Sequence, residues 1–128
     1  MLTYQIVLYF FRIKTITCLN VDRREEERIN DTMSLFVVKH EHSPESCPAM
    51  DPQIAPMLLS ELSEKNASKY GIKIHGEAVV NGEHTVYLIV DAPDEKTVNN
   101  FMSLFAQAGS VDVYPSSSCE RVVERGTC

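Results

Sequence analysis

The sequence lacks the features that mark several classes of binding protein. No basic run with interleaved aromatic residues is present, and the formal net charge is -6. General binding to nucleic acid is therefore not expected, because attraction to phosphates needs a basic face. No apolar stretch is long enough to span a bilayer, and no glycine-rich phosphate loop is found. These absences predict a protein without a nucleic-acid, membrane or nucleotide partner.

The four cysteines form neither a CxxC pair nor a dense framework. Without signs of secretion, this pattern predicts free thiols in a reducing compartment, and hence a cytoplasmic location. Cys119 and Cys128 lie in a polar tail, residues 116–128, where they could instead pair with each other. The other two cysteines are Cys18 and Cys47.

Residues 1–32 form an N-terminal extension that differs in character from the rest. A short apolar run begins directly after Met1, with no basic segment before it and no clear cleavage site after it, so a signal peptide is not favoured. Residues 23–28 are all Arg or Glu, which purine codons can encode. They could be a translated ribosome-binding tract before a true start at Met33. Alternatively, residues 2–16 could be an extra strand or helix.

The following stretch, residues 33–115, predicts one α+β domain. Alternating and helical periodicities predict strands at 34–40, 72–80, 83–91 and around 111–113, with helices over 51–70 and 93–108. Asp51 is a predicted helix N-cap, a kink is expected near residues 63–66, and Gly71 ends this helix. Asn81-Gly82 predicts a two-residue hairpin turn. The order β-α-β-β-α-β predicts a ferredoxin-like, four-stranded antiparallel sheet with both helices on one face.

The second face of this sheet also needs cover, because the first and third strands carry apolar residues of both parities. The sequence has Val-Lys-His-x-His at 38–42, Cys-Pro at 47–48 and Glu-His-Thr-Val-Tyr at 83–87. On these motifs and the element order, residues 33–115 resemble the dimeric α+β barrel superfamily. That superfamily includes small monooxygenases and muconolactone isomerases, and the chain looks closest to an uncharacterised family within it. The resemblance implies a homodimer and no particular activity.

The predicted topology gathers polar residues at one end of the sheet. In it the first and third strands are antiparallel neighbours, so His40 is expected near His84. His42 follows two positions after His40 and therefore points to the same face if the strand continues. Cys47 lies in the loop that leaves this end. We therefore expect a His/Cys cluster there.

The hairpin register extends this prediction to the second strand. If Val80 pairs with Glu83, then His75, Glu77 and His84 share one face of the sheet. All four histidines of the chain would then line one side.

One hypothesis for this cluster is a transition-metal site. Imidazole nitrogen and thiolate sulfur together suit zinc, copper or iron. The predicted ligands are His40, His42, Cys47 and His84, with His75 and Glu77 as second choices for a further ligand or an orienting residue.

Two other hypotheses remain open at this stage. The protein could be a cofactor-free enzyme with a small-molecule ligand, in which His40 or His84 is the general base and Cys47 is a nucleophile. Glu77 or Tyr87 could orient the substrate, although the register puts Tyr87 on the opposite face. The protein could instead be a non-catalytic interaction or regulatory module, in which the histidines are solvated. Whether it is an enzyme is left undecided.

Overall fold

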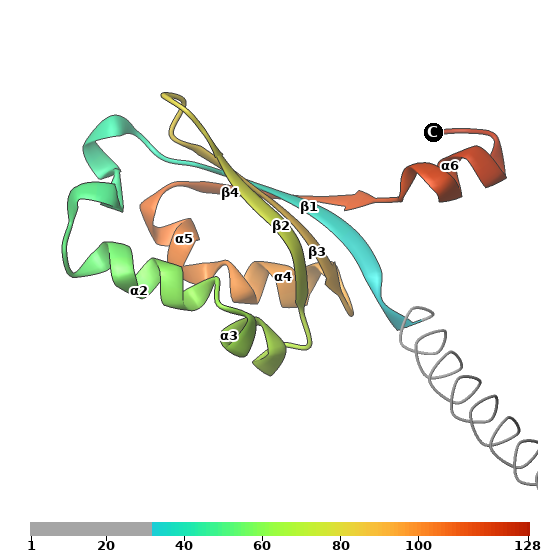
Figure 1. Cartoon of the computed structure of the whole chain (residues 1–128), viewed down its shortest axis with the longest axis horizontal. Helices are drawn as coiled ribbons and strands as arrows, with labels where there is room; N and C mark the ends of the chain where they lie inside the picture. Colours follow the sequence, from blue (N-terminus) through green and yellow to red (C-terminus); the bar gives the residue numbers. More distant parts are fainter. Residues whose placement is uncertain (1–31) are drawn as a thin grey trace, which may run out of the picture. The chain divides into compact units, whose positions relative to one another are not determined.

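The structure, a computed structural model described here for residues 32–128, contains an open four-stranded antiparallel sheet with several helices (Figure 1). The strand order is β2-β3-β1-β4. Met33–Cys128 form one compact unit. The ribosome-binding tract proposed at residues 23–28 and the extra element proposed at residues 2–16 both lie outside the described residues.

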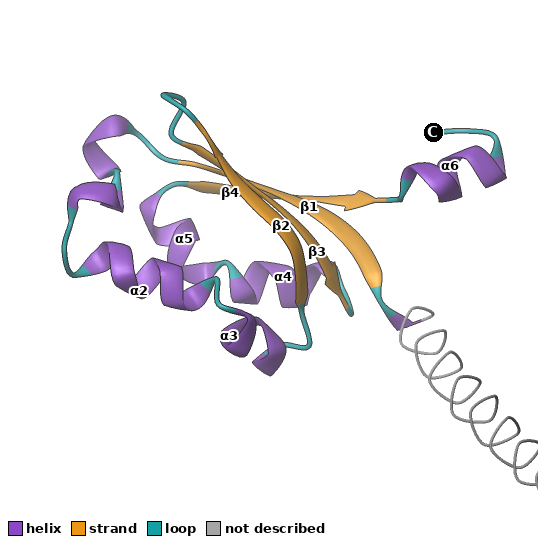
Figure 2. Cartoon of the chain, viewed as in Figure 1, coloured by secondary structure: helices purple, strands orange, loops and turns teal. Residues whose placement is uncertain are grey.

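The elements follow the predicted order, with short helical additions. The strands are β1 (Ser34–Glu41), β2 (Lys73–Val80), β3 (Thr85–Ala92) and β4 (Ser110–Ser116). The α-helices are α2 (Ile54–Glu61), α3 (Glu64–Lys69), α4 (Glu95–Phe101), α5 (Ser103–Ala108) and α6 (Cys119–Arg125), and the 3-10 helices are η1 (Pro44–Ser46) and η2 (Pro48–Met50). This α+β arrangement is consistent with the ferredoxin-like order. Helices α2 to α5 lie on one side of the sheet (Figure 2).

Side-chain caps explain where the first helical segment begins and breaks. Asp51 Oδ1 accepts hydrogen bonds from the backbone N–H groups of Gln53 and Ile54, at 2.9 and 3.1 Å. The regular helix starts only at Ile54. The expected kink is a full break, because Ser63 caps a separate helix, α3, by accepting from the backbone N–H of Asn66.

The core lies between the sheet and α3 to α5. Along β1, alternate residues Phe36, Val38 and His40 are buried toward the helices. Strand pairing places Val90 and Leu88 on the same side, because paired residues of an antiparallel sheet share a face. The helices contribute the following buried side chains: Ala67, Val98, Phe101, Met102 and Phe105. His40 is thus a polar group inside a hydrophobic layer, with 2% of its surface exposed.

The predicted hairpin register is wrong. Val80 pairs with Thr85 and not with Glu83, so residues 81–84 form a four-residue connection. Gly82 and His84 both have positive φ there, +76° and +52°. Because the shift is two residues, the parity of β2 is preserved, and Glu77 pairs with Leu88 on the helix side of the sheet.

The predicted position of His75, on the same face as Glu77 and His84, is also wrong. A β-bulge between Ile74 and Gly76 leaves His75 out of the regular pairing. A bulge adds one residue and so reverses the face on which the following positions would otherwise point. The His75 ring consequently meets Asp91, with Nε2 2.6 Å from Oδ2. It does not share a face with Glu77 and His84.

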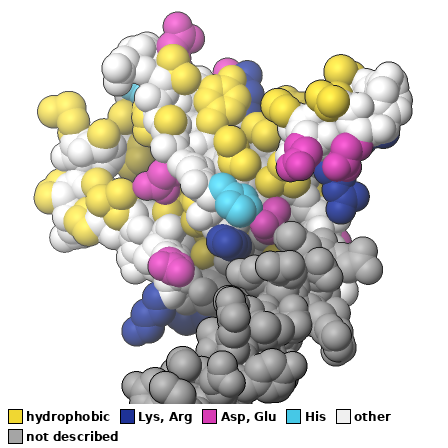
Figure 3. All heavy atoms as spheres, turned by 45° about the vertical axis from the view of Figure 1, so that its right-hand side comes forward, with side chains coloured by type: hydrophobic (Ala, Val, Ile, Leu, Met, Phe, Trp, Pro, Cys, Tyr) yellow, Lys and Arg dark blue, Asp and Glu magenta, His cyan; other side chains and the backbone are white. Residues whose placement is uncertain are grey.

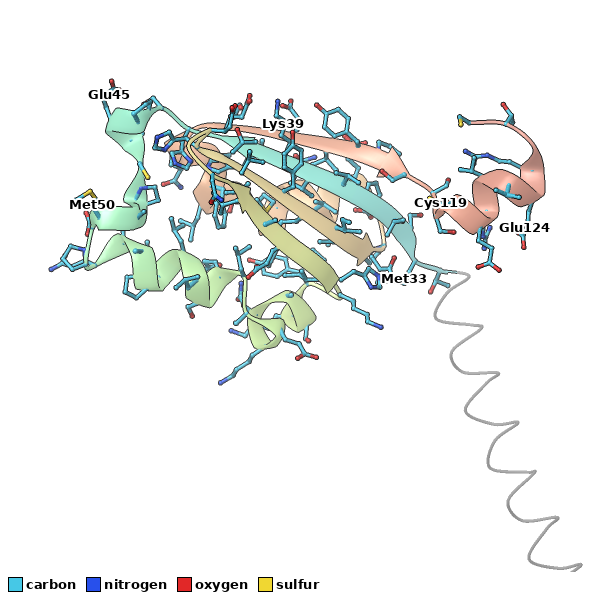
Figure 4. The ribbon with its side chains drawn as sticks, turned by 45° about the horizontal axis from the view of Figure 1, so that its top comes forward. Met33, Lys39, Glu45, Met50, Cys119 and Glu124 are labelled. Atoms are coloured by element: carbon cyan, nitrogen blue, oxygen red, sulfur yellow. The ribbon has the colours of Figure 1, made fainter. Side chains whose placement is uncertain are left out.

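The other face of the sheet carries no helix among residues 32–128 (Figure 1). Lys39 projects from this face (Figure 4), where its Nζ lies 2.9 Å from Glu41 Oε1. Tyr87, Ile89 and Tyr114 are exposed there, at 38%, 45% and 49%. The prediction that Tyr87 lies on the face opposite His40 is confirmed, because Tyr87 pairs with Lys39 while His40 pairs with Val86. The space-filling view in Figure 3 shows patches of hydrophobic side chains on the surface of the domain, with charged side chains between them.

The polar C-terminal stretch contains a helix that the sequence analysis did not predict. Ser118 Oγ accepts from the backbone N–H of Arg121 and caps the start of α6, and Gly126 ends it with φ +73°. Cys119 and Cys128 are free thiols. Among the described residues, no helix is long and apolar enough to cross a membrane.

Candidate metal centre

Three of the predicted ligands meet at the end of the sheet. One ring nitrogen of His42, Sγ of Cys47 and one ring nitrogen of His84 all lie within 4.8 Å of one another. Each is partly buried. In a zinc site each donor atom lies about 2.0 to 2.3 Å from the metal. The donor atoms of these three residues are close enough to one another for side-chain rotations to bring them around one ion. This group could hold a metal ion.

Backbone contacts fix His42 and His84 next to each other. The backbone N–H of His42 donates to the carbonyl of His84 at 3.2 Å, extending the β1–β3 ladder by one bond. The two rings are 5.2 Å apart and nearly perpendicular. His84 is the one residue other than glycine with positive φ in the described part of the chain. That left-handed conformation is uncommon and costs free energy outside glycine, so the surrounding fold must hold it.

Cys47 reaches the group because its loop is folded into two short turns. Ser43 Oγ accepts from the backbone N–H of Ser46, and the N–H of Cys47 donates to the carbonyl of Pro44 at 3.3 Å. Cys47 therefore sits at the junction of η1 and η2. Figure 4 shows Glu45 of η1 and Met50 of η2 on either side of this junction, at the same end of the sheet as the β2–β3 connection.

His40 lies directly behind this group. Its Nδ1 is 2.9 Å from the carbonyl oxygen of Ser110, and its Nε2 is 3.3 Å from Nδ1 of His42. A carbonyl only accepts, so Nδ1 of His40 carries the proton, and in a neutral ring Nε2 is then an acceptor. His42 Nδ1 must therefore donate to it. This chain of bonds leaves the lone pair of His42 on Nε2.

Burial favours the neutral form of both rings. Desolvation lowers the pKa of His40 below its usual value, and the hydrogen bond to Ser110 opposes this shift only in part. Desolvation likewise lowers the pKa of His42, and the nearby His84 ring lowers it further. Neutral imidazole is the form that binds metals.

His42 Nε2 is buried and has no hydrogen-bond partner among the described residues. A buried polar atom without a partner costs about 1–3 kcal/mol, and such atoms are rare in native proteins. This atom carries the lone pair of a ring that lies beside a thiol and a second imidazole.

The second-choice residues His75 and Glu77 are not part of this three-residue group. His75 is bound to Asp91 on the other face of the sheet and does not reach the group. Glu77 is exposed on β2 and lines the same cavity as His42 and His84. Ser110 also belongs to this site, but it contributes a backbone carbonyl, which its residue type could not indicate in the sequence.

A cavity of about 690 Å³ opens beside the three donor residues. Its walls are the loop that carries Cys47, helix α2, the β2–β3 hairpin and Phe105 of α5. Most of the lining is hydrophobic and includes Leu58, Val79 and Val86. A site for a small molecule typically has this size and character.

Comparison with protein-family models, with curated proteins and with solved structures gave no match. The superfamily resemblance in the sequence therefore stays a prediction.

Proposed function

We propose that this protein binds a transition-metal ion, zinc, copper or iron, through His42, Cys47 and His84. The observation that carries the proposal is the buried, unpartnered Nε2 of His42, in a ring that lies next to the other two donor residues. Coordination would give this atom the partner that the surrounding chain does not supply, and so removes the cost of its burial.

The donor set narrows the choice of ion. One thiolate and two imidazoles suit zinc, copper and iron, and exclude magnesium and calcium, which prefer oxygen ligands. Three protein ligands leave at least one position for water or another molecule, as in catalytic zinc sites. A closed structural site would need a fourth side chain. Glu77 is the one acidic residue that lines the cavity among residues 32–128.

In this proposal His40 orients a ligand and is not one itself, because both of its ring nitrogens are already engaged. The carbonyl of Ser110 holds its ring, and its Nε2 holds the proton of His42 on Nδ1. Ligand histidines commonly have such a hydrogen-bonded partner behind them.

The direct test is titration of the metal-free protein, purified without an affinity tag, with Co²⁺. Binding is expected at one ion per chain, with a sulfur-to-cobalt charge-transfer band that reports the Cys47 thiolate. Zn²⁺ should displace the cobalt and abolish the band. Absence of saturable binding, or binding without the sulfur band, would contradict the proposal.

His40 gives a prediction of its own. His40→Leu removes the acceptor for His42 Nδ1–H and is expected to weaken zinc binding by about 10- to 100-fold. His40→Gln keeps an amide oxygen and should recover part of that loss. Competition with a colorimetric chelator measures both affinities, and equal affinities for the two variants would refute the orienting role.

We also propose that two copies of the domain pack sheet to sheet as a dimeric barrel. The supporting observation is the hydrophobic face opposite the helices, where Tyr87, Ile89 and Tyr114 are exposed. Exposed apolar surface of this kind commonly marks an interface between proteins. A second copy would cover it with the same residues, since a two-fold interface is self-complementary.

Ile89→Lys is expected to shift this dimer to monomers, because the substitution would bury a charge in the interface. Sedimentation equilibrium should give twice the chain mass of 14.4 kDa for the wild type and a value near 14.4 kDa for the variant. Met50→Lys, at a residue 94% exposed on the helix side, is the matched control and should stay dimeric. A monomeric wild type at high concentration would rule out this dimer.

A further inference from the structure

The cavity beside the metal centre has two kinds of wall. His42, Cys47 and His84 border it on one side, so a coordination position that they left open would be accessible from it. The remaining border is mainly hydrophobic, with Leu58 and Leu62 from the α2 segment and Val79 and Val86 from the hairpin. A molecule in this space would contact a Lewis acid at one end and aliphatic carbon over the rest.

The charges of the lining decide which head group fits. No lysine or arginine lines the cavity within residues 32–128, and the carboxylate of Glu77 does. An anionic head group would therefore be attracted only by the metal ion and would be repelled by the carboxylate of Glu77. An uncharged oxygen, nitrogen or sulfur donor has no such penalty.

We infer that the cavity binds an uncharged, mainly hydrophobic small molecule through one donor atom that occupies the open position of the metal. This inference rests on the proposed metal site and names the class of ligand that the site accepts. The volume of about 690 Å³ lies in the range of pockets for drug-sized molecules. Hydrophobic burial supplies affinity, and the single metal–donor bond sets the orientation.

The test uses the cobalt-loaded protein and two probes that share a donor, imidazole and 4-phenylimidazole. Both should perturb the cobalt d–d absorption, and 4-phenylimidazole should bind at least about tenfold more tightly, because its ring buries apolar surface. Ethylbenzene, which has no donor, should leave the spectrum unchanged.

Two variants locate the effect. Val79 is 61% exposed and lines the cavity, so Val79→Ser should leave the fold and the cobalt spectrum intact while reducing the advantage of 4-phenylimidazole by about threefold or more. Val123→Ser, at a valine on α6 that is 78% exposed and does not line the cavity, is the control and should change nothing.

The outcomes separate the two claims. If cobalt binds with its sulfur band but 4-phenylimidazole has no advantage over imidazole, or Val79→Ser leaves that advantage intact, the ligand inference fails and the metal site stands. A probe with a carboxylate in place of the imidazole that binds as tightly would overturn the uncharged head group. If no cobalt binds, the proposed function fails and this inference falls with it.

Discussion

His42→Ala is expected to weaken zinc binding by more than about a hundredfold, because loss of an orienting residue behind a ligand already costs 10- to 100-fold. The substitution removes the Nε2 donor that the fold buries without a partner. Cys47→Ser and His84→Ala, which remove the other two donors, should have comparable effects. Isothermal titration calorimetry or chelator competition would measure the change.

Thermal unfolding provides a second readout of the same prediction. A ligand that binds only the folded state adds about 2.7 kcal/mol when its concentration is 100 times Kd. Zinc should therefore raise the melting temperature of the wild type and leave that of His42→Ala almost unchanged. His75→Ala is the matched control, because this histidine faces Asp91 and not the metal group. If His75→Ala reduced the zinc-induced rise in melting temperature as much as His42→Ala, the assignment of His42 as a metal ligand would be disproved.

Gly109→Ala is expected to cost about 3 kcal/mol of folding free energy, near the upper end for a forced steric overlap in a packed region. An added Cβ would lie 1.9 Å from the carbonyl oxygen of Glu41 and 3.0 Å from Cα of His42. These are backbone atoms and cannot rotate away. The start of β4 would have to separate from the end of β1.

The same displacement should reach the proposed metal site, because Ser110 is the next residue and its carbonyl accepts the hydrogen bond from His40. Urea denaturation of the metal-free protein measures the stability, and chelator competition on the folded fraction measures the affinity. Gly76→Ala is the control, since a Cβ there meets nothing within 4 Å. Its effect should stay within about 0.5 kcal/mol. Equal stabilities for the two variants would show that the close approach at Gly109 does not matter.

Local signals in the sequence were enough for most of the fold. Asp51 accepts hydrogen bonds from backbone N–H groups two and three residues further on, so its role could be predicted from its position. The break near residues 63–66 was also predicted, and Ser63 caps the helix that follows it. Both parities of β1 are apolar in the sequence, so only the structure shows that Phe36, Val38 and His40 form its buried face. Helix α6 was not predicted because a short polar segment has no hydrophobic periodicity, although Ser118 and Gly126 are residue types typical of helix caps.

The hairpin shows where local signals fail. Asn-Gly favours a two-residue turn, but the pairing of β3 with both β1 and β2 determines the register. His84 consequently leaves the strand and adopts φ +52°. The bulge at His75 has the same origin, since one extra residue in a strand is invisible to an alternating pattern.

The sequence by itself determined which residues could meet: antiparallel neighbours bring the end of one strand to the start of the other, so His42 and His84 follow from chain order. Only the tertiary structure decided which of them could bind. The Ser110 carbonyl, 70 positions from His40, assigns the proton on each ring, and the same packing buries His42 Nε2 without a partner. Protonation and desolvation depend on atoms distant in sequence, and for that reason no local pattern contains them.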